Sequence, residues 1–153
     1  DANQLQTVTM LNGAAPDQIV SFFYGPDGQR VKKAVTGGKT TLYLDADSEY
    51  DDEDDVYTRY PHTDIKMVGT AKYYLHRDHL ASVRAVTDGA GAIVEDSRYS
   101  AYGRPTNTAM ASKSYIGERR DPETGLMYLN ARYMDPTLGR FIPADPTPEQ
   151  ARR

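Results

Sequence analysis

The chain has 153 residues, enough for one ordinary domain, and it contains no cysteine. The absence of cysteine excludes a disulfide framework, a thiol nucleophile and a thiolate metal site, and no apolar run approaches the roughly 18 residues of a membrane-spanning helix. The net charge of −4 is divided unevenly, with sixteen acids against nine Lys and Arg up to residue 97 and six acids against nine bases after it. No basic stretch is dense enough to predict nucleic-acid binding. No targeting segment is visible, and we expect the chain to be a piece of a longer protein.

Turn signals separate short runs that are rich in β-branched and aromatic residues. The dipeptides Asn12-Gly13, Asp27-Gly28, Gly37-Gly38 and Asp88-Gly89 tolerate the positive φ of tight hairpins. Between them, strands are predicted in chain order at residues 18–24, 30–35, 40–44, 56–60, 72–76, 82–87, 93–99 and 126–133. Twelve of the fifteen aromatic residues are Tyr, which suits a half-buried pleated surface.

The final predicted strand has the clearest period of two. It would place Met127, Leu129, Ala131 and Tyr133 on one face and the intervening residues, including Tyr128, on the other. The only helical signal is a possible single turn at residues 108–113. The sequence therefore predicts an all-β chain of antiparallel hairpins, and the similar hairpins at residues 23–31 and 86–94 suggest repeats that stack into a coiled ribbon.

Two features could bind metal ions, and neither fits a specific site. Residues 45–55 hold eight acids in eleven positions. An EF-hand loop starting at Asp45 would need glycine where Tyr50 stands and glutamate where Val56 stands, so we predict a solvated acidic loop and leave nonspecific cation binding open. His76 and His79, three apart on a strand, would point to opposite faces and are expected to be structural. No metal and no cofactor is predicted.

The second half of the chain carries motifs of a known family. Residues 73–88 read YYLHRDHLASVRAVTD, residues 99–105 read YSAYGRP, and residues 115–146 read YIGERRDPETGLMYLNARYMDPTLGRFIPADP. In this order they resemble the RHS/YD-repeat family and its RHS repeat-associated core. The resemblance divides the chain into degenerate YD-type repeats over residues 1–72 (with the acidic loop 45–55), the core over residues 73–146, and a tail at 147–153.

The resemblance implies a strip of β-sheet that spirals into a hollow shell, closed by a C-terminal core or plug segment. Bacterial polymorphic toxins, insecticidal toxin complex C components and cell-wall-associated proteins belong to that family, which implies secretion or a cell-surface location. The expected function is encapsulation, with the chain forming shell wall and the boundary to a C-terminal cargo. The expected partners are the cargo and the remainder of its own shell or an RHS-type partner protein.

The resemblance also implies self-cleavage by a pair of aspartates in some members, with Asp145 matching the first of them. The second aspartate and the cleaved bond would lie beyond residue 153, so whether the full protein is an enzyme is left open. This chain alone is not expected to be an enzyme, because a lone carboxylate lacks the shared proton of a pair. Another alternative is a self-assembling or adhesive surface protein that forms homo-oligomers through open strand edges.

Several residues are expected to have structural roles. Arg132 and Arg140 are predicted to pair with carboxylates such as Asp121 and Asp135 or with carbonyl groups, because polar groups inside a curved sheet must be satisfied. Gly125 and Gly139 are expected at turns or bulges. Tyr133 is also expected to have a structural role.

Overall fold

The computed structural model describes residues 4–11, 13, 17–107, 112–130 and 132–142. Ten strands form one antiparallel sheet in which each pairs with its neighbours in sequence. These are β1 (Thr7–Met10), β2 (Gln18–Tyr24), β3 (Arg30–Val35), β4 (Thr40–Asp45), β5 (Ser48–Asp51), β6 (Val56–His62), β7 (Ile65–Val68), β8 (Ala71–Arg77), β9 (Val83–Asp88) and β10 (Ile93–Asp96). The sheet continues across residue 72 without a break.

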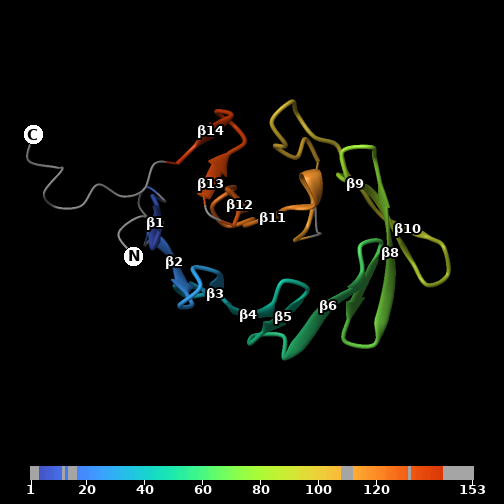
Figure 1. The fold of residues 1–153 in the computed structure, drawn as a ribbon, viewed down its shortest axis with the longest axis horizontal. Coiled ribbons are helices and arrows are strands. Elements are labelled where there is room, and N and C mark those ends of the chain that lie inside the picture. The colour runs from blue at the N-terminus through green and yellow to red at the C-terminus, as the bar shows by residue number, and fades with distance from the viewer. Residues whose placement is uncertain (1–3, 12, 14–16, 108–111, 131, 143–153) are drawn as a thin grey trace, which may run out of the picture.

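A second, four-stranded antiparallel sheet follows a single 3-10 turn, η1 (Tyr115–Gly117). Its strands are β11 (Arg119–Arg120), β12 (Met127–Leu129), β13 (Arg132–Asp135) and β14 (Arg140–Phe141). Figure 1 shows the ten-stranded sheet curving into an open arc, with η1 and the four-stranded sheet inside that arc. The prediction of an all-β chain built from antiparallel hairpins in a curved sheet is confirmed, together with a C-terminal segment that fills its concave side.

Glycine and aspartate explain the hairpin turns. Gly28 and Gly37 have φ of +78° and +70°, as their dipeptides predicted. The turn after β9 differs from the prediction, because its positive φ falls on Gly91 and not on Gly89. There the Asp88 carboxylate accepts hydrogen bonds from the backbone N–H groups of Ala90 and Ala92, both at 2.9 Å, which closes the turn.

The predicted single strand at residues 126–133 is wrong, because the segment is a hairpin. Asn130 adopts a φ of +59°, which ends β12 and reverses the chain into β13. Tyr128 consequently lies directly opposite Tyr133 on the same face, and their ring centroids are 5.2 Å apart. Strand 93–99 was also predicted too long, since β10 ends at Asp96, and the possible helical turn at 108–113 falls mostly outside the described residues.

The acidic run is only partly the solvated loop that was predicted, because its two ends form exposed turns but a strand lies between them. Strand β5 lies within it, pairing with β4 and β6 on either side. Its Glu49 side chain is buried, while Tyr50 packs on Tyr57 with the ring centroids 4.8 Å apart. Strands β1 and β7 were missed as well.

Two apolar clusters hold the arc together. The larger joins the two sheets and contains Val20, Phe22, Val35, Leu126, Tyr128 and Tyr133. The smaller lies within the ten-stranded sheet and contains Tyr60, Leu75, Val83 and Val86. Between these clusters the concave side of β3 to β7 faces β11 across a polar interior.

Candidate functional site

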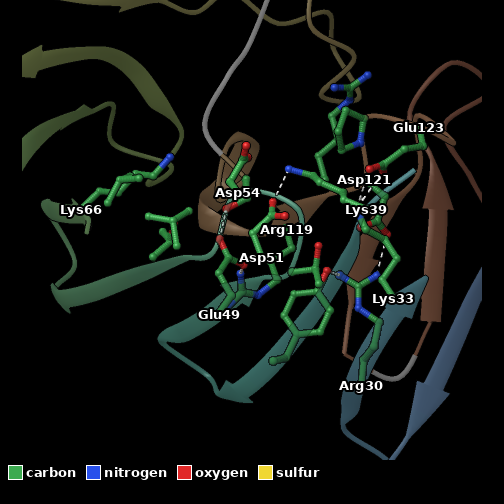
Figure 2. A pocket seen from close by; sticks show the side chains of 18 residues that line it. Arg30, Lys33, Lys39, Glu49, Asp51, Asp54, Lys66, Arg119, Asp121 and Glu123 are labelled. Atoms are coloured by element: carbon green, nitrogen blue, oxygen red, sulfur yellow. Dashed lines mark hydrogen bonds and ion pairs between the residues drawn. The ribbon is translucent and has the colours of Figure 1, made fainter. Parts of the chain in front are cut away.

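The polar interior contains a cavity of about 250 Å³, shown in Figure 2, which we call the inner cavity. Its wall comes from β3 to β7 on one side and from Ser112 and residues 119–123 on the other. Charged side chains dominate its lining: Arg30, Lys33, Lys39, Glu49, Asp51, Asp54, Lys66, Arg119, Arg120, Asp121 and Glu123.

The pleat of the sheet explains why charges gather here. Lys33 lies opposite Thr41, Thr41 opposite Asp51, and Asp51 opposite Val56, so these four residues form one row across β3 to β6. All four line the inner cavity. Because alternate residues of a strand face opposite sides, the neighbouring row that contains Lys32 and Tyr50 faces the other surface of the sheet.

A buried ion pair between Arg30 and Asp121 lies at the wall of the cavity. The Arg30 Nη1 atom is 2.6 Å from the Asp121 Oδ2 atom, and the two side chains are 1% and 2% exposed. Arg30 also donates hydrogen bonds to the hydroxyl groups of Tyr133 at 3.1 Å and Tyr43 at 2.9 Å. Its guanidinium lies 4.4 Å from the centroid of the Tyr128 ring, so aromatic faces complete its surroundings.

Burial and the ion pair act on this cluster in opposite directions. Burial disfavours the charge of Arg30, but the Asp121 carboxylate outweighs it and the pKa of Arg30 lies above its ordinary value. Burial raises the pKa of Tyr43 and of Tyr133 well above the ordinary value of a phenol. The guanidinium of Arg30 therefore keeps its charge among phenols that stay neutral.

A second set of ion pairs joins the sheet to residues 119–123. Lys33 donates to both carboxylate oxygens of Glu123, at 3.0 and 2.8 Å, and its Nζ atom lies 3.5 Å from Asp121. Arg119 pairs with Glu49 of the acidic run. These contacts tie strands β3 and β5 to a segment about 70 to 90 residues further along the chain.

Glu49 also accepts a hydrogen bond from a chain of hydroxyl groups. The Ser112 hydroxyl donates to Glu49 Oε1 at 2.8 Å, and the Tyr60 hydroxyl lies 2.7 Å from Ser112 Oγ. Burial raises the pKa of Tyr60 to about 12, so this phenol stays neutral at physiological pH. The acidic run is thus partly folded inward, and Lys39 pairs with its Asp51.

The two arginines that the sequence singled out do not line the inner cavity. Arg132 and Arg140 are exposed, and neither forms an ion pair with another described residue; Arg132 lies 4.0 Å from the centroid of the Phe141 ring. The arginine that pairs with Asp121 is instead Arg30, because the concave side of β3 faces Asp121 while Arg132 of β13 and Arg140 of β14 are exposed. Asp145 falls outside the described residues.

The remaining predicted residues take part in turns and packing. Asp135 accepts a hydrogen bond from the backbone N–H of Thr137 at 2.7 Å, which shapes the turn between β13 and β14. Gly125 and Gly139 have φ of +73° and +64°. Tyr133 is buried, and its hydroxyl oxygen accepts the hydrogen bond from Arg30. Of the histidines, His76 contacts the Thr87 hydroxyl at 3.0 Å.

The arrangement is suited to holding segments together. Four of the five acids that line the inner cavity pair with a cation, and in the described ranges no three His, Asp or Glu side chains cluster as metal ligands would. Sequence reasoning missed Arg30 and Glu49, which lie far in sequence from their partners. The sequence offered one clue to the ion pair, namely Asp121, which was expected to pair with an arginine.

Within the described segments no helix is both long and apolar enough to cross a bilayer.

Residues 49–151 match the Teneurin YD-shell family. The chain is 32% identical to the tRNA nuclease WapA of Bacillus subtilis strain 168, over 85% of this chain but 6% of that protein. It is 33% identical to the double-stranded DNA deaminase toxin A of Burkholderia cenocepacia strain H111, over 48% of this chain and 6% of the relative. Among solved structures, TcdB2-TccC3 superposes with a TM-score of 0.79 at 21% identity, covering 94% of this chain and 9% of the other.

Proposed function

The chain belongs to the Teneurin YD-shell family of RHS/YD-repeat proteins, and from that premise we propose that it forms one stretch of the wall of a closed shell around a polypeptide. The chain spans 6% of the length of the tRNA nuclease that it resembles, so the proposal concerns a longer protein of the RHS toxin type. Its role there is to enclose a C-terminal segment and to form the boundary to it.

One observation carries this proposal: the four-stranded sheet docks on the concave side of the ten-stranded sheet through a buried ion pair. An antiparallel sheet commonly packs one face on a core and leaves the other in water, and an uncovered hollow side would be the wet one. Here the hollow side instead holds apolar packing around Tyr128 and Tyr133 and the Arg30–Asp121 pair. This supports a wall whose inner face makes contacts with another part of the chain that its outer face does not make.

The strand order supports continuation of the wall. The ten strands follow one another without a crossover, and β1 has an open edge in the part of the chain that the structure describes. An open edge presents unpaired N–H and C=O groups that can pair with a further strand. The partner we propose for it is the remainder of the same shell, or an RHS-type partner protein, in a secreted or surface-exposed molecule.

Protease access tests the proposal in the full-length protein that contains this chain. A recognition sequence for a site-specific protease is placed in the segment downstream of the shell in one variant, and at the exposed Gly37-Gly38 turn in a matched control. We expect cleavage of the control in the native state, and cleavage of the downstream site only after unfolding. Equal cleavage rates at the two sites in the native protein would contradict enclosure.

A further inference from the structure

The cations of the inner cavity do not all have a counter-ion. Six cationic side chains line it, and four pair with an acid: Arg30, Lys33, Lys39 and Arg119. Lys66 of β7 and Arg120 of β11 form no side-chain hydrogen bond or ion pair with another described residue. Figure 2 shows Lys66 standing apart from the labelled ion pairs around Asp121.

The Arg120 side chain stays positively charged and has a donor without a partner among the described residues. Its Nε atom is buried and has no hydrogen-bond partner in the described part of the chain. Burial lowers the pKa of Arg120, but a guanidinium remains protonated at any physiological pH. The position of the residue is fixed from both sides, since its backbone N–H donates to the Ser112 carbonyl at 2.9 Å and β11 pairs with β12. An unpaired donor is therefore held beside the cavity.

Lys66 adds a second cation to the same cavity. The side chain is only partly exposed, and burial lowers the pKa of Lys66, while the carboxylates of Glu49 and Glu95 act in the opposite direction. Glu49 already binds Arg119 and Ser112. Asp54, the one lining acid without an ion pair to a described residue, is exposed. A partly buried cation without an ion-pair partner is costly, and a counter-ion lowers that cost.

We propose that the inner cavity binds an anionic group, a carboxylate or a phosphate, attracted by the two lining cations that form no ion pair with a described residue, Lys66 and Arg120. A guanidinium offers a planar pair of donors to the oxygens of such a group, and an ammonium adds a point charge. A cavity of about 250 Å³ accommodates a group of this size. The anion can be a free ion or a carboxylate of an enclosed polypeptide; only the second source rests on the proposed function.

Thermal unfolding of the 153-residue chain tests the site, with sodium phosphate compared with sodium chloride at equal ionic strength. We expect phosphate to raise Tm saturably, because a ligand that binds only the folded state stabilises it. Lys66→Met and Arg120→Gln should weaken the apparent phosphate affinity at least tenfold. Lys72→Met removes the same charge at an exposed position and should leave that affinity unchanged. A phosphate response that is absent, or equal in Lys66→Met and Lys72→Met, would overturn the proposal.

Two further measurements distinguish loss of phosphate binding from loss of folding, and a free anion from a polypeptide carboxylate. Lys66→Met should unfold at a higher temperature than the parent in chloride, since it removes an unpaired charge, so loss of phosphate binding in it is not a loss of folding. A hexaglutamate peptide distinguishes the sources: tighter binding than phosphate, lost in Lys66→Met, assigns the site to a polypeptide carboxylate. Binding of phosphate alone supports a free-ion site and leaves the proposed enclosure unaffected.

Discussion

Arg30 and Asp121 are 91 residues apart in sequence, and their side chains meet at 2.6 Å in the interior of the molecule. The pair connects the first third of the ten-stranded sheet to the loop between β11 and β12 of the four-stranded sheet. It therefore fixes how the C-terminal part sits inside the arc.

Removing one partner of this pair should be strongly destabilising. We expect Asp121→Asn to lower the free energy of unfolding by about 3–5 kcal/mol, because Arg30 would be left buried without a counter-charge. Asp64→Asn, which breaks the pair of an exposed carboxylate with Arg77, should cost less than about 1 kcal/mol. Urea unfolding of both variants measures the difference, and similar losses would contradict the assigned role of Asp121.

The hydroxyl group of Tyr128 should also contribute to the stability of the fold. It accepts a hydrogen bond from the backbone N–H of Arg30 at 3.1 Å in a buried position. Tyr128→Phe leaves this donor unsatisfied and should cost about 1–3 kcal/mol. Tyr57, half exposed on the other face of the sheet, provides the control, since Tyr57→Phe should stay within about 0.5 kcal/mol of the parent.

Alanine substitutions at Gly103 and Gly125 distinguish the cost of backbone strain from the cost of steric overlap. Gly103 has φ of +88°, and a Cβ there would lie 2.6 Å from Cγ of Tyr115, whose hydroxyl is bonded to the Ala101 carbonyl. Gly125 has φ of +73° with nothing within 4 Å of such a Cβ. Gly125→Ala should cost about 1–2 kcal/mol from the left-handed backbone alone, and Gly103→Ala about 2–5 kcal/mol. Equal costs in thermal unfolding would show that the Tyr115 ring yields.

Stability should fall at alkaline pH. Burial raises the pKa of Tyr43, of Tyr133 and, to about 12, of Tyr60. An unfolded tyrosine loses its proton near its ordinary pKa of about 10 while the folded one retains it, so the unfolded state is favoured progressively above that pH. Each such group contributes up to about 1.4 kcal/mol per pH unit. Urea unfolding between pH 9 and 12 checks this, and Tyr60→Phe should reduce the slope between about pH 10 and 12; an unchanged slope would refute the contribution of Tyr60.

We further expect that the 153-residue chain does not cleave itself, although Asp145 matches one aspartate of the self-cleaving pair in the family that the sequence resembles. A lone aspartate lacks the coupled titration of a pair. Intact-mass spectrometry during prolonged incubation tests this. Slow scission that disappears in Asp145→Asn would show that the chain carries a complete cleavage site.

The sequence predicted local structure better than long-range contacts. Strands β2 and β3 have the predicted bounds, because β-branched and aromatic runs there end at turn dipeptides. Strand β5 was missed because its acids suggest a solvated loop, and the Arg119 side chain that neutralises Glu49 lies 70 residues away. The β12–β13 turn was missed because Asn130, not glycine, adopts the positive φ. Asp121 was expected to pair with an arginine, but no local spacing could identify Arg30 as that arginine.

The sequential order of the ten strands has a consequence for biosynthesis. Each strand needs only the preceding one as a template, so the ribbon can form hairpin by hairpin as it emerges from the ribosome. The lysines and arginines of its concave side then remain hydrated until residues 119–123 are made and Asp121 and Glu123 arrive. Closure of the arc is thus delayed until synthesis is well into the final third of the chain.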